Sequence, residues 1–148
     1  MSKEKEINYR AYFGIKFYED NRNRDEINSI SATLQDDGIH NICIARDVEK
    51  WGDVTLSSQE LMRITFEEIE KSDFVILEMS EKGVGLGIEA GFAVAGNKPL
   101  IVLIKQGLKL SNTIQGIANI VIPYSQPNEI KISVHNKLLQ KALARSGS

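Results

Sequence analysis

The sequence predicts an α/β protein with a small, doubly wound, mainly parallel five-stranded sheet and helices on both faces. Short apolar segments alternate along the chain with amphipathic stretches of helical period, and right-handed crossovers place such helices on both sides of a parallel sheet. The segment "DFVILEM" is apolar at nearly every position, which is typical of a central strand covered on both faces.

Five apolar segments are the predicted strands, over residues 7–15, 40–45, 73–79, 98–104 and 119–124. The predicted helices cover residues 21–37, with Gly38 after the end, 57–72, 86–96 and 110–118, and one further helix closes the chain with Val134, Leu138, Leu139 and Ala142 facing inward. In the second strand lies Cys43, the single cysteine, which we expect to pack in the core. A polar connection at residues 47–58 has no periodicity, and long connections often carry function.

Length and composition limit the function classes. The 148 residues fit a single domain spanning residues 1–148, and no apolar run approaches the ~20 residues that a membrane span needs. The start "MSKEKEINYR" lacks an apolar signal core, so we expect a cytoplasmic protein. A net charge of -2 offers no general attraction for a nucleic acid polymer. His40 and His135 are isolated, so we expect no metal and no cofactor.

The glycine-rich stretch "GVGLGIEAG" at residues 83–91 follows the central strand and raises three interpretations. Its part "GLGIEA" fits a loose dinucleotide-binding pattern, but the next strand ends at Lys105 without the carboxylate that would bind the ribose. The glycines could instead serve only close packing, with Glu89 an exposed residue in the first helical turn.

The third interpretation is a catalytic site. Gly83, Gly85 and Gly87 each cost roughly 0.5–1 kcal/mol relative to alanine in regular structure, which suggests that a ligand needs the space. Glu89 lies where that space opens, and we expect nearby amide groups to keep it ionised. A positioned, ionised carboxylate is the group that attacks the anomeric carbon of a sugar in retaining glycosidases. The stretch "YFGIKFYED" after the first strand is expected to face the glycine-rich stretch.

The segments "AYFG", "EKSDFVILEMSEKGVGLGIEAGFAVAGNKPLIVL" and "LKLSNTIQG" resemble the nucleoside 2-deoxyribosyltransferase superfamily, including the 2'-deoxynucleoside 5'-phosphate N-hydrolases. The resemblance covers nearly the whole chain and implies a dimeric or larger enzyme. It implies that Glu89 is the nucleophile and that Tyr12 lies at the mouth of the site. It also implies that Ser111 reaches a substrate phosphate across the dimer interface.

The sequence departs from the superfamily pattern at three places. After the first strand the hydrolases carry Tyr-Phe-x-Gly-Ser-Ile-Arg, whereas this chain retains Gly14 and leaves Lys16 as the phosphate partner. Gly83 stands where the superfamily has Ser or Asp, and Thr65 stands where a helix Asp helps protonate the base or orient water. Without that acid we expect slow turnover, unless Glu68 or a substrate-held water replaces it.

Three functions therefore remain open. The first is cleavage of the N-glycosidic bond of a nucleoside or its 5'-monophosphate, with transfer of the sugar to water or to a second base. The second is a nucleotide-sensing relative that binds without catalysis, and the third is an α/β interaction domain. Base identity, ribose against deoxyribose and hydrolysis against transfer depend on pocket shape, which the sequence leaves open.

Overall fold

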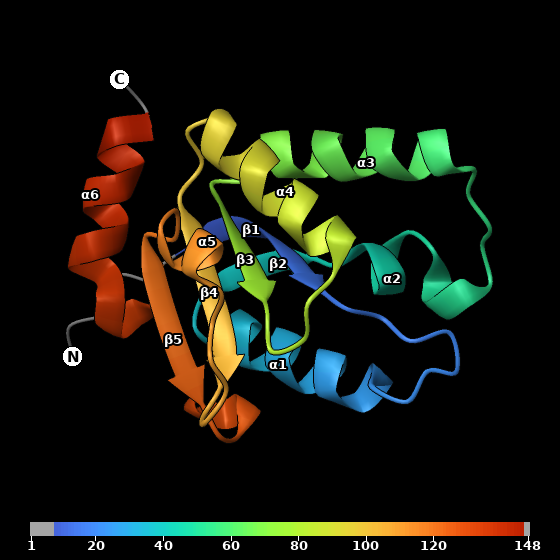
Figure 1. Cartoon of the computed structure of the whole chain (residues 1–148), viewed down its shortest axis with the longest axis horizontal. Coiled ribbons are helices and arrows are strands. Elements are labelled where there is room, and N and C mark those ends of the chain that lie inside the picture. The colour runs from blue at the N-terminus through green and yellow to red at the C-terminus, as the bar shows by residue number, and fades with distance from the viewer. Residues whose placement is uncertain (1–7, 147–148) are drawn as a thin grey trace.

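A computed structural model describes residues 8–146, and these form a five-stranded sheet covered by helices (Figure 1). The strands are β1 (Tyr9–Ile15), β2 (Ile39–Ile42), β3 (Phe74–Glu78), β4 (Leu100–Lys105) and β5 (Ile120–Tyr124). Every neighbouring pair is parallel, in the order β2-β1-β3-β4-β5. The predicted fold class is confirmed. Ile7 of the first predicted strand and the last two residues lie outside the described part.

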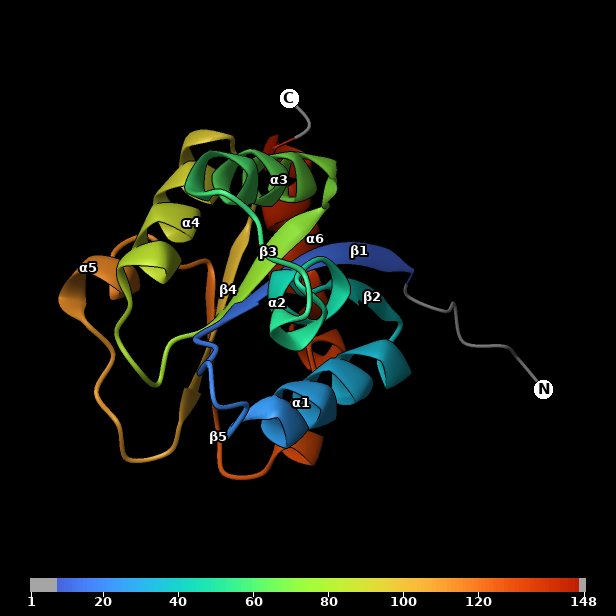
Figure 2. The same cartoon turned by 90° about the vertical axis from the view of Figure 1, so that its right-hand side faces the viewer.

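Helices lie on both faces of the sheet. They are α1 (Arg24–Asp36), α2 (Ile44–Asp47), α3 (Ser58–Lys71), α4 (Val84–Ala95), α5 (Asn112–Gln115) and α6 (Asn136–Ser146), with short 3-10 turns η1 (Lys50–Gly52), η2 (Pro127–Glu129) and η3 (Ser133–His135). Figures 1 and 2 show α3 and α4 on one side of the sheet and α1 on the other. Between residues 8 and 146, no helix has the length and apolar character to cross a membrane.

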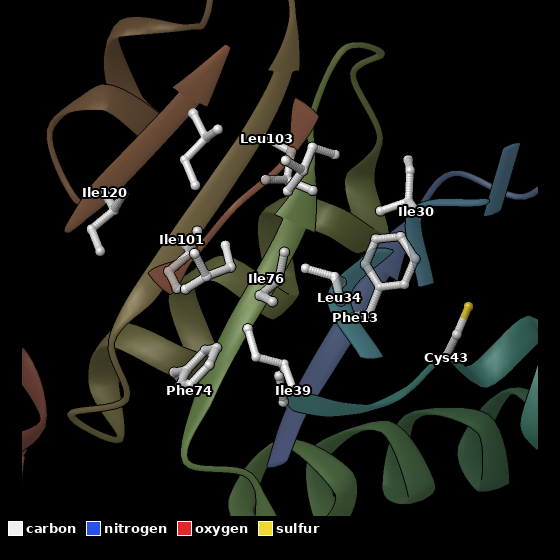
Figure 3. Packing of buried hydrophobic residues seen from close by; sticks show 14 of the residues in the cluster. Phe13, Ile30, Leu34, Ile39, Cys43, Phe74, Ile76, Ile101, Leu103 and Ile120 are labelled. Carbon is white, nitrogen blue, oxygen red and sulfur yellow. The ribbon is translucent and has the colours of Figure 1, made fainter. Parts of the chain in front are cut away.

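Two hydrophobic cores follow from the alternation of side chains along each strand. On β3, Phe74 and Ile76 join the core beneath α1, whereas Val75 and Leu77 join the core beneath α3 and α4. Figure 3 shows Phe13 of β1 near Ile30 and Leu34 of α1. The preceding residue, Tyr12, therefore points to the opposite face, toward α3 and α4.

Two helix starts determine where the candidate residues lie. At α3, the hydroxyl of Ser57 accepts a hydrogen bond from the backbone N–H of Glu60 (3.1 Å), within a capping box. At α4 the first helical residue is Val84, preceded by Gly83 without a side-chain cap. Because α4 begins two residues earlier than predicted, Glu89 lies in its second turn rather than its first.

Other sequence predictions were wrong. Cys43 is buried but directly follows β2 and leads into α2, so the second strand is shorter than predicted. The polar connection contains the η1 turn and, at its start, only Asp47, the last residue of α2. In the closing helix Leu139 is buried as predicted, whereas Val134 and Leu138 are 71% and 55% exposed; Val134 precedes α6, which begins at Asn136.

Candidate active site

A cavity of about 180 Å³ opens at the carboxyl end of β1. Its wall includes side chains or backbone from β1, the connection after β2, α3 and α4, among them Tyr12, Gly14, Cys43, Glu49, Thr65 and Glu89. The chain order reverses between β1 and β3, and doubly wound sheets bind ligands where such a reversal opens a crevice. The cavity is the candidate active site.

Tyr12 and Glu89 meet on the α4 side of the sheet. The phenolic O–H of Tyr12 donates a hydrogen bond to Oε1 of Glu89, with 2.6 Å between the oxygens. Tyr12 is 3% exposed and lies within β1, so the expectation that it marks the mouth of the site was wrong. Burial, with the nearby Glu89 carboxylate, raises the pKa of Tyr12 well above its usual value. Tyr12 therefore stays protonated and acts as a fixed donor to Glu89.

Gly14 provides the space that the Glu89 carboxylate occupies. A Cβ at this position would lie 2.6 Å from Oε1 of Glu89 and 2.6 Å from Cδ2 of Leu77, which is too close for either atom. A glycine inside a strand often marks such a close approach. Gly14 thus belongs to the site through its missing side chain.

Burial raises the pKa of Glu89 to about 7, although the hydrogen bond from Tyr12 opposes this shift. The expectation that nearby amide groups keep Glu89 ionised was therefore wrong: desolvation favours the neutral carboxyl group, and the opposing cause is the hydrogen bond from Tyr12. Near neutral pH the carboxyl group exists in both protonation states. A nucleophile needs the ionised state, which prevails only above a pH of about 7.

Thr65 lies in the cavity wall, and its hydroxyl donates to the backbone oxygen of Leu61 (2.8 Å). Its orientation toward the sheet agrees with the sequence prediction, since it is buried. Glu68, the predicted substitute acid, forms ion pairs with Arg10 (2.6 Å) and Lys71 (3.5 Å) and is not part of this wall. The structure therefore does not bring Glu68 to the site.

Lys16 lies in a second cavity of about 280 Å³ beside the first. Its ammonium group is 3.6 Å from a carboxylate oxygen of Glu81, and Tyr18 donates a hydrogen bond to the same oxygen. These contacts join the loop after β1 to the loop after β3, so the two stretches face each other as predicted. They also give Lys16 an acidic partner that any phosphate would have to displace.

Of the remaining predicted residues, only Gly85 is close to the Glu89 carboxylate, since an added Cβ there would lie 3.6 Å from Oε2 of Glu89. Gly85 lines the cavity, but Gly83, Gly87 and Ser111 are not among its lining residues. An added Cβ at Gly87 would meet no atom within 4 Å, so this glycine leaves bare helix surface. Ser111 caps α5, where its hydroxyl accepts a hydrogen bond from the N–H of Ile114 (3.3 Å). Among residues 8–146, no group of three or more His, Cys, Asp or Glu side chains could hold a metal ion.

The sequence pattern did not predict the position of Glu49, which the connection after β2 brings to the cavity. Its neighbours Lys50 and Trp51 have positive φ angles of 49° and 60°, although neither is glycine. Only the length of this connection pointed to a role. Burial raises the pKa of Glu49, as it does for Glu89.

The fold is shared with nucleoside-processing enzymes. The chain is similar to the CMP N-glycosidase BcmB of Clostridium botulinum (18% identity, 89% of this chain and 95% of that chain covered, TM-score 0.59). It is similar to a 2-deoxyribosyltransferase of Bacillus psychrosaccharolyticus (14% identity, 87% and 95% covered, TM-score 0.67). The resemblance noted in the sequence is thus confirmed at the level of the fold.

A response regulator receiver domain of Clostridium thermocellum is also similar (17% identity, 93% and 97% covered, TM-score 0.56). The sequence matches no protein-family model and no curated protein. Because one fold supports unrelated functions, the case for an activity depends on the site itself.

Proposed function

We propose that this protein is an enzyme that cleaves the N-glycosidic bond of a nucleoside or nucleoside 5'-monophosphate, with Glu89 as the nucleophile. The sugar passes to water or to a second base. The observation that carries the proposal is the partly buried Glu89 carboxyl group, held by Tyr12 at 2.6 Å in a cavity at the strand reversal. The two nucleoside-processing enzymes of the same fold support the substrate class.

The chemistry would run in two steps. Ionised Glu89 forms a bond to C1' of the sugar while the bond from C1' to the base breaks, which gives a covalent glycosyl-enzyme. Water or a second base then attacks C1' and releases Glu89. The Tyr12 hydroxyl orients the carboxylate, and Gly14 allows its approach to the strand.

Incubation with a panel of nucleosides and 5'-monophosphates, followed by chromatography of the released bases, tests the proposal. Base release that Glu89→Gln abolishes supports it, because the amide keeps the shape of the side chain but cannot attack. Comparing nucleosides with their 5'-monophosphates tests the role of Lys16. A substrate phosphate can pair with Lys16 only if Lys16 separates from Glu81. We therefore expect the 5'-phosphate to raise activity modestly at most.

A nucleotide-binding protein without catalysis is the second candidate. The observation in its favour is Thr65, whose hydroxyl already donates to Leu61 and offers no acid for the leaving base. Thermal unfolding with the same panel separates the two candidates, because a ligand that binds only the folded protein raises Tm whether or not it is cleaved.

We further propose that a second copy of the chain completes the site. On the outer face of α4, Val84 is 83% exposed and Ile88 is 46% exposed, next to the bare backbone of Gly87. Covering this apolar face by a partner would also allow Ser111 of that partner to approach the substrate. Light scattering at micromolar concentration tests this idea, and a purely monomeric protein would contradict it.

A further inference from the structure

We propose that Glu49 is the proton donor of the reaction, so that its carboxyl group protonates the leaving nucleobase. The inference rests on the proposed function, in which Glu89 attacks the sugar. It assigns to the connection after β2 the task that Thr65 on α3 cannot perform.

The position of Glu49 supports this role. Glu49 lines the same cavity as Glu89 but belongs to a different segment, the connection after β2. No hydrogen bond or ion pair within the described chain engages its carboxyl group. The other nearby acids are occupied: Asp47 pairs with Arg46 (2.8 Å), and Glu68 pairs with Arg10 and Lys71. Glu49 is free to contact a ligand.

An unusual turn holds Glu49 in place. Positive φ angles at Lys50 (49°), Trp51 (60°) and Gly52 (97°) follow it directly, and such angles are uncommon for residues other than glycine. The backbone oxygen of Glu49 accepts a hydrogen bond from the N–H of Val54, and its own N–H donates to the oxygen of Ile44, both at 2.9 Å. Strained turns of this kind persist where the surroundings fix them, and they are common at active sites.

Aromatic contacts of Trp51 anchor the same turn. The Trp51 ring lies 5.8 Å from the ring of Phe17, and the guanidinium of Arg24 lies 4.7 Å from its centre. Phe17 follows β1 and also lines the cavity. The turn that carries Glu49 is therefore fastened to the loop after β1, which borders the same cavity.

The titratable groups of the cavity wall differ in their suitability as acids. They are Tyr12, Cys43, Glu49 and Glu89. Burial raises the pKa of Cys43 to about 11 and that of Tyr12 well above its usual value, so both are weak acids. Glu89 is needed as the nucleophile. Burial raises the pKa of Glu49, and a bound base that excludes water would raise it further, which increases its protonated fraction.

In the proposed step, Glu89 attacks the sugar and Glu49 protonates the leaving base. An ionised oxygen of Glu89 bonds to C1', the bond from C1' to the base nitrogen breaks, and its electron pair goes to the base. The base takes the proton of the Glu49 carboxyl group, leaving a carboxylate. In hydrolysis, water then attacks C1', its proton passes to Glu49, and the electron pair of the ester bond returns to Glu89.

Paired substrates test the role of Glu49 in proton transfer. Ordinary purine and pyrimidine nucleosides need a proton on the leaving base. Their 7-methylpurine and 5-nitrouracil counterparts do not, since these bases leave as a neutral molecule or a stabilised anion. Glu49→Gln should lower kcat/KM by about 10²- to 10⁴-fold on the ordinary substrates and leave the activated ones nearly unchanged. The control Asp53→Asn, an exposed acid on the same connection, should change neither.

The outcomes separate this inference from the proposed function. An equal loss on both kinds of substrate, or no loss on either, would overturn the role of Glu49 alone. A native protein that cleaves none of the substrates refutes the proposed function, and the role of Glu49 falls with it. If Glu49→Gln does not fold, Glu49→Asp takes its place: it should lose activity on the ordinary substrates only, and an equal effect on both kinds would overturn the proposal.

Discussion

The phenolic oxygen of Tyr12 lies 2.6 Å from a carboxylate oxygen of Glu89, although 77 positions separate the two residues in the sequence. Tyr12 points from β1 toward α4, as alternate side chains of a strand do. Gly14, two residues further along the same strand, leaves room for the Glu89 carboxylate. The contact lowers the pKa of Glu89, while burial raises it to about 7. The proposed nucleophile is therefore balanced between its two protonation states near neutral pH.

Removing the hydroxyl of Tyr12 should shift the pH dependence of activity. On the activated substrates, which need no proton from Glu49, Glu89 must still be ionised to attack, so kcat/KM of the native protein should rise with pH through about 7. In Tyr12→Phe the hydrogen bond that lowers this pKa is lost. Hydrogen bonds to charged groups contribute roughly 1.5–3 kcal/mol, and one pKa unit is about 1.4 kcal/mol, so the rising limb should move up by about one unit or more. An unchanged pH profile would contradict this role of Tyr12.

Glu89→Gln should make the protein more stable at alkaline pH. The folded-state pKa of Glu89, about 7, lies above the ordinary value of 4.5. Its contribution to stability is therefore fully present below the unfolded-state value and is lost as the pH rises through about 7. The amide of the Gln variant does not ionise, so the variant does not lose this stability as the pH rises. Unfolding followed across pH should give a higher Tm for Glu89→Gln above pH 7 (about the folded-state pKa) and a shrinking difference toward acid pH.

The control for this measurement is Asp53→Asn, which removes an exposed carboxylate. It should show no stabilisation that grows with pH. A Glu89→Gln protein whose Tm difference from the native protein is the same at every pH would show that Glu89 is not held in a desolvated site.

Much of the fold could be predicted because local pattern and global topology agree. The apolar segment that became β3 is buried at all five positions, and a parallel sheet covered on both faces requires this. The predicted start of α3 at Ser57 was confirmed to within one residue because a capping box gives a local signal. The start of α4 was missed because Gly83 provides no side-chain cap.

The site was less predictable because its geometry depends on packing between distant segments. The glycines after β3 drew attention, yet the close approach to Glu89 occurs at Gly14, where a glycine inside a strand was the available signal. Burial rather than position in the helix sets the pKa of Glu89, and burial cannot be read from residue spacing. The turn at Glu49 depends on positive φ angles at Lys50 and Trp51, residues that do not favour them.

Gly14→Ala should damage the site more than any alanine in the glycine-rich stretch. The new Cβ would lie 2.6 Å from Oε1 of Glu89 and from Leu77, which should cost about 1–3 kcal/mol of stability and displace the carboxylate. Gly87→Ala is the matched control, since its Cβ would meet no atom within 4 Å and alanine favours a helix. Urea unfolding and base release should both be impaired in Gly14→Ala. Equal stability of the two variants would contradict the steric role of Gly14.

Thr65→Asp should restore proton transfer to a protein that lacks Glu49. Thr65 lines the same cavity, and an aspartic acid there would supply an acid from α3. The double variant Glu49→Gln with Thr65→Asp should therefore release ordinary nucleobases faster than Glu49→Gln alone, at some cost in stability because the position is buried. The measurement is the rate of base release from ordinary nucleosides by the single variant and by the double variant. No recovery, in a double variant that remains folded, would show that the two positions do not serve the same step.

Mass spectrometry of the protein quenched during turnover tests the role of Glu89 most directly. After incubation with a nucleoside that it cleaves, the native protein should gain the mass of one sugar residue, and digestion should locate that sugar on the peptide carrying Glu89. The Glu89→Gln protein should carry no adduct and release no base. A sugar attached to another residue, or base release that persists in Glu89→Gln, would contradict the account.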